Sequence, residues 1–150
     1  MTGSVNEGDL AGGTITYTAI VHGVDCDLMG HLNTARSAAM FDAATWNMMN
    51  RFGYRWRRDA ELGWVDVKNV IQYEREVPVD AAVRIVTSVL RMGEKSITLL
   101  HELQTGESWA RATSFEAVLV QFDNRHRRAT AIPESYRTKI GEYLLPTRSL

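Results

Sequence analysis

The sequence is poor in cysteine, in net charge and in long apolar runs. Cys26 is the only cysteine, so no disulfide can form within the chain, and we expect a reducing, cytoplasmic location. The formal net charge of -1, from 17 basic and 18 acidic residues, argues against nucleic-acid binding, which usually needs a basic excess on one face. No stretch is apolar enough to span a membrane, and the N-terminal MTGSVNEGDLAGG has no signal-peptide core.

What is present fits one ordinary globular domain. The chain has 150 residues, of which 45% are hydrophobic and 23% are charged. A chain of this length can bury one real core. Residues 1–12 are polar and glycine-rich, so we expect a flexible N-terminal tail there, followed by a single domain over residues 13–150.

The order of expected elements is strand, loop, long helix and then four strands. Residues 14–22 alternate β-branched and aromatic side chains, which predicts a strand. Residues 34–50 are rich in alanine and methionine, which predicts a helix with Asn33 or Thr34 as its N-cap. Ala38, Phe41, Ala44, Thr45 and Met48 form its expected buried stripe. The later strands are expected over residues 64–77, 81–92, 96–104 and 107–123, with a short helix after Pro133.

This order predicts an α+β fold. One long helix followed by strands joined through short turns needs a sheet that covers the helix. A curved antiparallel sheet wrapped around one central helix would satisfy both surfaces.

The chemistry concentrates between Val24 and Asn33. Two carboxylates, an imidazole and a carboxamide, from Asp25, Asp27, His31 and Asn33, fall just before the expected helix. The N-terminus of a helix offers unpaired N–H groups and partial positive charge, which can hold a polarised carbonyl oxygen. A carboxylate beside it can act as a general base or a nucleophile, and Gly30 would let the backbone approach a ligand.

Three simpler interpretations of this stretch stay open. Asp27 and Asn33 can merely cap the helix, because such residues are common before helices. Asp25, Asp27 and His31 can form a metal site, although later acidic ligands and further His or Cys residues are missing. Cys26 can be a nucleophile, although in an extended stretch it would point away from its neighbours.

The order D-x-D-x-x-G-H-x-N, followed by a helix with an acidic residue, resembles the hotdog-fold acyl-CoA thioesterases. The 4-hydroxybenzoyl-CoA thioesterase-like group is the most similar branch, and the resemblance covers roughly residues 14–140. It implies the hotdog fold and hydrolysis of an acyl-CoA to a free acid and coenzyme A. It implies no metal and no cofactor beyond the coenzyme A of the substrate.

The resemblance also assigns roles to individual residues. Asp27 matches the catalytic aspartate, acting as nucleophile or general base. Thr34 matches the position at the helix N-terminus whose backbone N–H contacts the thioester carbonyl. The other matched positions shape the loop or face the acyl pocket: Gly30, His31, Asn33 and Asp42. Serine at position 37, where the family usually has tyrosine, implies a gap in that pocket.

Coenzyme A phosphates are held in this family by basic residues of the later strands. Lys95 and Ser96 resemble a K-S pair used there, and Arg128 matches a basic residue before the last proline segment. Arg91 is a further candidate, as are Arg125 and Arg127, because the run NRHRR is dense for a nearly neutral protein.

The resemblance further implies a homodimer, or a dimer of dimers, in which strands pair edge to edge and both chains contribute to each site. An exposed edge strand needs covering in any case. Two alternatives to a thioesterase remain: a hotdog hydratase or dehydratase using His31 with Asp27 or Asp42, and a non-catalytic acyl-CoA-binding protein.

Overall fold

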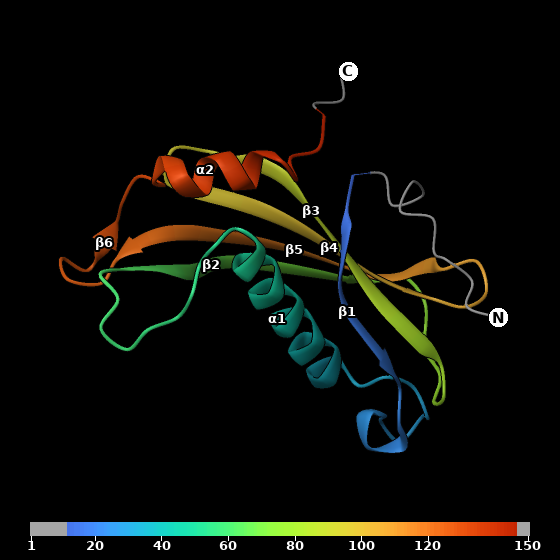
Figure 1. Ribbon diagram of the computed structural model, residues 1–150. Coiled ribbons are helices and arrows are strands. Elements are labelled where there is room, and N and C mark those ends of the chain that lie inside the picture. The colour runs from blue at the N-terminus through green and yellow to red at the C-terminus, as the bar shows by residue number, and fades with distance from the viewer. Residues whose placement is uncertain (1–11, 147–150) are drawn as a thin grey trace.

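A long helix lies across one antiparallel sheet (Figure 1). The computed structural model describes residues 12–146, so nearly all of the tail expected at residues 1–12 lies outside the described residues. The helices are α1 (Thr34–Arg51) and α2 (Glu134–Gly141), with a short 3-10 turn at Gly23–Asp25. The strands are β1 (Thr14–Ile20), β2 (Leu62–Tyr73), β3 (Ala82–Met92), β4 (Ser96–Thr105), β5 (Ala110–Asp123) and β6 (Arg128–Ala129).

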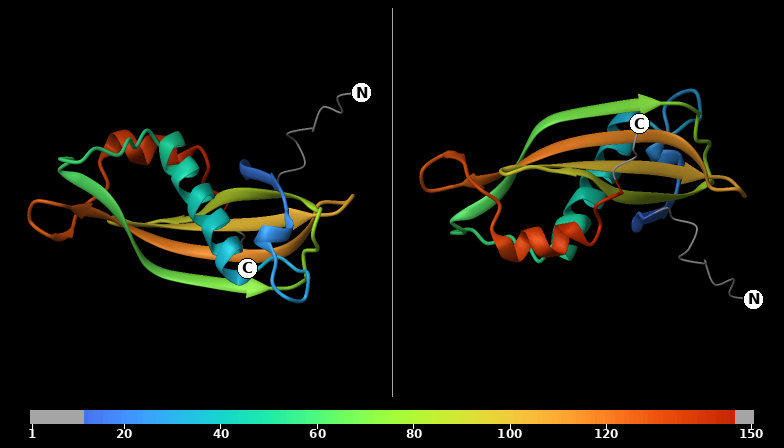
Figure 2. Two further views of the ribbon diagram at one scale, coloured as in Figure 1. Left: turned by 90° about the horizontal axis from the view of Figure 1, so that it is seen from below. Right: turned by 90° about the horizontal axis from the view of Figure 1, so that it is seen from above.

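The strands follow the order β1-β3-β4-β5-β2, with β6 paired to the end of β5. Every paired strand is antiparallel, which confirms the predicted α+β fold with its curved sheet around a central helix. Figure 2 shows β2 alone along one margin of the sheet. Within residues 12–146 no helix is long and apolar enough to cross a membrane.

Two predicted strand boundaries are wrong by three or four residues, and two by two residues, since β1 ends at Ile20 rather than residue 22 and β2 begins at Leu62 rather than residue 64. β2 ends at Tyr73 rather than residue 77, because the next two N–H groups, of Glu74 and Arg75, both donate to the carbonyl of Ala112 and the ladder stops there. β5 begins at Ala110 rather than residue 107, because Trp109 has a positive φ of 51° in the preceding turn. The residues that follow β2 therefore leave the sheet and form hydrogen bonds with the loop before α1.

The buried face of α1 makes the core. Phe41, Ala44 and Met48 are fully buried, and the Phe41 ring lies 5.0 Å from that of Phe115 on β5. Ala38 was expected in the buried stripe, but it is exposed, because the stripe begins one residue earlier at Ser37.

A chain of polar side chains crosses this core. His101 of β4 lies 3.0 Å from the Thr45 hydroxyl of α1 and 2.6 Å from the Thr87 hydroxyl of β3. Thr87 in turn lies 2.7 Å from the Thr16 hydroxyl of β1. Burial lowers the pKa of His101 to about 3, so the ring is neutral and can both donate and accept. These hydrogen bonds join α1 to three strands at the β1 side of the sheet.

Candidate active site

A tight turn presents the Asp27 carboxylate. The Asp27 N–H donates to the His31 carbonyl at 2.9 Å, and the Gly30 N–H donates to the Asp27 carbonyl at 3.1 Å. Gly30 has φ of 78°, a conformation that favours glycine, which explains the glycine at this place. One carboxylate oxygen, Oδ1, accepts from the N–H groups of Met29 and His31. Among the described residues the other oxygen, Oδ2, has no hydrogen-bond partner.

α1 begins at Thr34, seven residues after Asp27. Asn33 is the N-cap, as predicted, and its side chain accepts the Ala35 N–H at 2.8 Å. The Asn33 carbonyl accepts the Ser37 N–H at 2.9 Å. Within residues 12–146 no acceptor pairs with the N–H of Thr34, which is the first residue of the helix and exposed. This N–H is available to an incoming carbonyl oxygen.

Asp25 fixes the loop to the helix, a role that the sequence did not show. Its side chain is buried and accepts from Arg36 at 2.7 and 2.9 Å and from the His22 N–H at 3.0 Å. The His22 N–H and the Arg36 guanidinium hold the pKa of Asp25 below its usual range. The Asp25 carbonyl also accepts the Asn33 N–H. The turn with Asp27 and the first turn of α1 are therefore held together.

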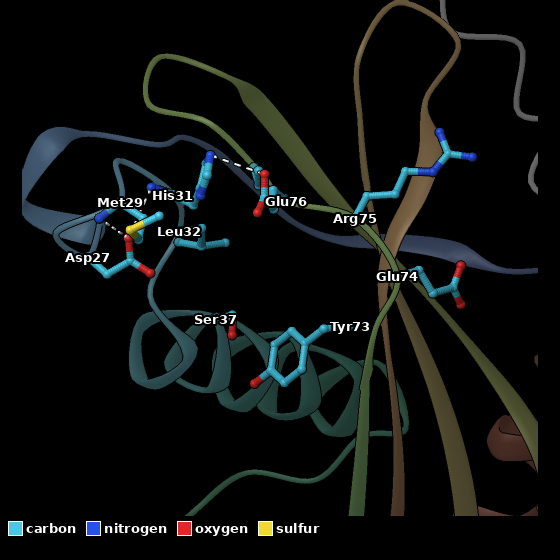
Figure 3. Close-up of a pocket in the computed structure, with 10 residues that line it drawn as sticks. Asp27, Met29, His31, Leu32, Ser37, Tyr73, Glu74, Arg75 and Glu76 are labelled. Atoms are coloured by element: carbon cyan, nitrogen blue, oxygen red, sulfur yellow. Dashed lines mark hydrogen bonds and ion pairs between the residues drawn. The ribbon is translucent and has the colours of Figure 1, made fainter.

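A pocket of about 330 Å³ opens beside this turn (Figure 3). It collects three residues that the sequence singled out, Asp27, His31 and Ser37. The opposite wall is residues 73–77, at the end of β2. Met29 and Leu32 supply apolar surface. A carboxylate, an imidazole and the first turn of α1 thus face one space.

The wall from β2 brings Glu76 to His31. Backbone hydrogen bonds from Leu32 to Val77 (2.8 Å) and from Val79 to Gly30 (3.3 Å) fix the two segments side by side. The His31 Nε2 atom lies 3.3 Å from Glu76 Oε2. Sequence reasoning missed Glu76, because nothing local marks a residue that lies 45 positions from its partner.

Ser37 and Tyr73 form the floor of the pocket. Ser37 is almost fully buried, and its hydroxyl donates to the Thr34 carbonyl at 2.9 Å. Figure 3 shows the Tyr73 ring over α1, with its hydroxyl turned toward Ser37. Both side chains line the pocket. The aromatic ring beside Ser37 in this pocket thus comes from Tyr73 of β2.

Asp42 does not line this pocket. It is exposed on α1, and its negative charge acts on Asp66 of β2. Partial desolvation raises the pKa of Asp66, a hydrogen bond from Asn69 opposes this, and the charge of Asp42 adds to the rise. The role expected for Asp42 at an acyl pocket stays a prediction.

The expected coenzyme A residues lie at the opposite end of the sheet from Asp27. Lys95 lies in the turn between β3 and β4, Ser96 begins β4, and Arg128 lies on β6. Arg91 precedes the same turn. The loop with Asp27 lies at the other end, where Ile20 of β1 pairs with Ala82 of β3. Within one protomer, these basic residues therefore lie far from the loop with Asp27.

The structure bears differently on the three simpler interpretations of the Asp27 region, namely a helix cap, a nucleophilic Cys26 and a metal site. The cap is real, but it is made by Asn33, while Asp27 stabilises its own turn. Cys26 donates to the His22 carbonyl, and burial raises the pKa of its thiol, which disfavours a nucleophilic thiolate. Asp25 binds Arg36 instead of turning to Asp27 and His31, and residues 12–146 contain no group of three metal-ligating side chains.

Comparison with known families identifies the chain. The model of the thioesterase-like superfamily matches residues 21–140, so the chain belongs to this superfamily, and its fold is the hotdog fold. A Staphylococcus aureus protein, SAV2348, solved in complex with CoA, has a TM-score of 0.81 at 19% identity, over 92% of this chain and 90% of that chain.

Two further structures are similar. PA2801 from Pseudomonas aeruginosa, which carries a provisional thioesterase assignment, has a TM-score of 0.73 at 26% identity, over 85% of this chain and 99% of that chain. Slr0204 from Synechocystis, a 1,4-dihydroxy-2-naphthoyl-CoA thioesterase, has a TM-score of 0.74 at 14% identity, over 85% of this chain and 95% of that chain. A comparison with curated proteins finds no match.

Proposed function

We propose that this protein hydrolyses an acyl-CoA thioester to a free acid and coenzyme A. One observation carries the proposal: Asp27 and Ser37, a residue of the first turn of α1, line the same pocket, although Thr34 itself is not among the lining residues. The Thr34 N–H has no acceptor within the described residues and can hold the thioester oxygen, where negative charge develops in the reaction. The relative crystallised with CoA supports coenzyme A as the thiol carrier.

Asp27 supplies the reactive carboxylate. Its Oδ1 atom is held by two N–H groups, so the side chain is fixed, while Oδ2 has no partner among the described residues. Oδ2 either attacks the thioester carbonyl or takes a proton from water. Coenzyme A leaves as a thiolate, so its departure needs no strong acid.

A second copy of the chain completes the site in this proposal. β2 runs from the basic end of the sheet at Leu62 to the pocket at Tyr73, and its outer edge is unpaired. Antiparallel pairing of two β2 strands would lay the Leu62 end of one copy against the Tyr73 end of the other. The hairpin between β5 and β6, which carries Arg125, Arg127 and Arg128, would then approach the pocket of the other copy and meet the coenzyme A phosphates.

The decisive experiment is thiol release from a panel of aromatic, short-chain and long-chain acyl-CoAs. Replacing Asp27 by Asn keeps the size of the side chain but removes the carboxylate, so we expect kcat to fall by roughly 10²- to 10⁴-fold. Asp59→Asn is the matched control, because Asp59 is exposed in the connection between α1 and β2. Wild-type turnover in the Asp27 variant would refute the assignment.

The same panel separates the other functions. His31 and Glu76 give the pocket a histidine and a carboxylate, which a hydratase also needs. With crotonyl-CoA, hydration changes the ultraviolet absorbance without releasing thiol. Binding of acyl-CoA without either signal would indicate a protein that only binds its ligand.

A further inference from the structure

Glu76 and His31 form a pair inside the pocket that has no part in the function proposed so far. Figure 3 shows the Glu76 carboxylate and the imidazole facing each other across the upper pocket. The distance from Nε2 to Oε2 is 3.3 Å. Asp27 is bound to the same turn, since its backbone N–H donates to the His31 carbonyl. The three side chains line one space.

The carboxylate selects one form of the imidazole. A neutral imidazole carries its proton on one nitrogen and accepts on the other. Because Glu76 lies 3.3 Å from Nε2 and only accepts when ionised, it favours the tautomer that carries the proton on Nε2. The Nδ1 atom is then the proton acceptor of the ring, and no side chain among residues 12–146 occupies it.

We propose that Glu76 is a positioning residue that makes His31 the base for water in the second half of the hydrolysis. The proposal rests on the thioesterase function above and goes further, because it assigns Asp27 the part of nucleophile. The water attacks an acyl group that Asp27 already carries.

The steps balance as follows. An Asp27 oxygen bonds to the thioester carbon, the C–S bond breaks, and coenzyme A leaves as the thiolate with the electron pair. Water then bonds to the acyl carbon while one of its protons passes to His31 Nδ1. The bond from that carbon to Asp27 breaks, which restores the carboxylate and gives the free acid. His31 then gives its proton to solvent, which balances the proton that the released thiolate takes up, and Glu76 stabilises the imidazolium in between.

Stability does not explain this pair. The Glu76 side chain is 76% exposed, and exposed ion pairs contribute little to folding. The backbone before Glu76 is held by the N–H groups of Glu74 and Arg75, which donate to Ala112, and the backbone after it by the bonds of Val77 and Val79 to the turn; none of these bonds involves the Glu76 side chain. Replacing Glu76 should therefore leave the fold and the thermal midpoint unchanged.

The test uses rapid-mixing thiol release from the full-length protein with the best acyl-CoA of the panel. In Glu76→Ala the water step becomes slow while thiol departure does not. We expect a burst of about one thiol per site and then a kcat at least about tenfold below wild type, as part of the roughly 10²- to 10⁴-fold that a positioned base contributes. His31→Asn should show the same burst. Glu102→Gln, which removes an ion-paired carboxylate outside the pocket, should behave as wild type.

A double-mutant cycle shows whether Glu76 acts through His31. If it does, adding Glu76→Ala to His31→Asn changes kcat by less than about twofold. An equal loss in both backgrounds, or a fall in kcat without a burst, would overturn the proposal.

Nitrogen NMR of the His31 ring provides a readout that does not depend on turnover. We expect the Nε2–H form in the wild type and a mixture of both forms in Glu76→Ala; an unchanged ring would overturn the proposal. A wild type that releases no thiol, or an Asp27→Asn variant as active as wild type, would instead refute the thioesterase function itself.

Discussion

The two sides of α1 differ in how they meet the sheet. Toward β1, Asn47 donates to the Thr16 carbonyl at 2.7 Å and Arg51 donates to the Ile15 carbonyl at 3.3 Å, so helix side chains cover the outer edge of that strand. The buried hydrogen bonds through His101 also join α1 to the sheet on this side. Toward β2, no hydrogen bond within the described residues reaches α1.

This difference shows which edge is left for another chain. An unpaired edge is a template for further pairing unless something blocks it. On β1, two carbonyls are already bonded to Asn47 and Arg51, whereas β2 exposes three valines in its middle, Val65, Val67 and Val70. The open edge ends at the pocket wall. A second copy that pairs with the β2 edge would therefore lie close to the pocket with Asp27.

Preventing two chains from pairing through β2 should have the largest effect on activity. Val67 is the unpaired residue of a bulge in the middle of β2 and is 56% exposed. In Val67→Lys, two lysines would meet when two strands pair about their middle, and like charges at an interface cost several kcal/mol. We expect sedimentation to show monomers of 16.9 kDa in place of dimers, with thiol release lost in the same variant.

Leu90→Lys is the control for this variant. Leu90 is an apolar side chain of β3 that is 38% exposed and lies away from the β2 edge. It should leave both mass and turnover unchanged. A monomeric Val67 variant with full activity would show that the partner adds nothing to the site.

The elements near the helix were predictable from the sequence, because the signals there are local. The alanine-rich run predicted α1, and Asn33 predicted its start. Gly30 was expected to let the backbone approach a ligand, and its positive φ explains the glycine without testing that role. Each of these depends on residues within a few positions of one another.

The partners of those residues were not predictable, because strand register decides them. Glu76 reaches His31 only because β2 leaves its ladder at Tyr73 and the chain then pairs with the turn. Lys95 and Arg128 match a family pattern, yet in one protomer they lie at the far end from Asp27. A motif carries no information on which copy of the chain supplies a residue.

The buried hydrogen bonds of His101, which join α1 to the sheet, should make the stability of the protein fall in acid. Since burial lowers the pKa of His101 to about 3, the unfolded chain, with a pKa near 6.5, binds the proton first as the pH falls. Stability is therefore complete above pH 6.5 and falls below it by up to about 1.4 kcal/mol per pH unit. Urea unfolding at one protein concentration should show a loss of about 2 kcal/mol between pH 6.5 and 5.

The His101→Gln variant isolates this effect. Its side chain keeps hydrogen-bonding capacity but does not titrate, so its stability should change much less over the same pH interval, whatever its stability at neutral pH. Equal acid sensitivity in both proteins would mean that other groups cause the loss.

The smallest effect concerns the cover of the β1 edge. Asn47→Ala removes the hydrogen bond to the Thr16 carbonyl, worth about 1 kcal/mol, while alanine itself favours the helix by a few tenths. Asn50→Ala makes the same change nearly one turn later on α1, where the side chain accepts one exposed hydrogen bond from Arg55, and so cancels the helix propensity. The difference between the two free energies of unfolding should be about 1 kcal/mol. If it were close to zero, Asn47 would not hold α1 to β1, and the asymmetry between the two edges would depend on the buried chain through His101 alone.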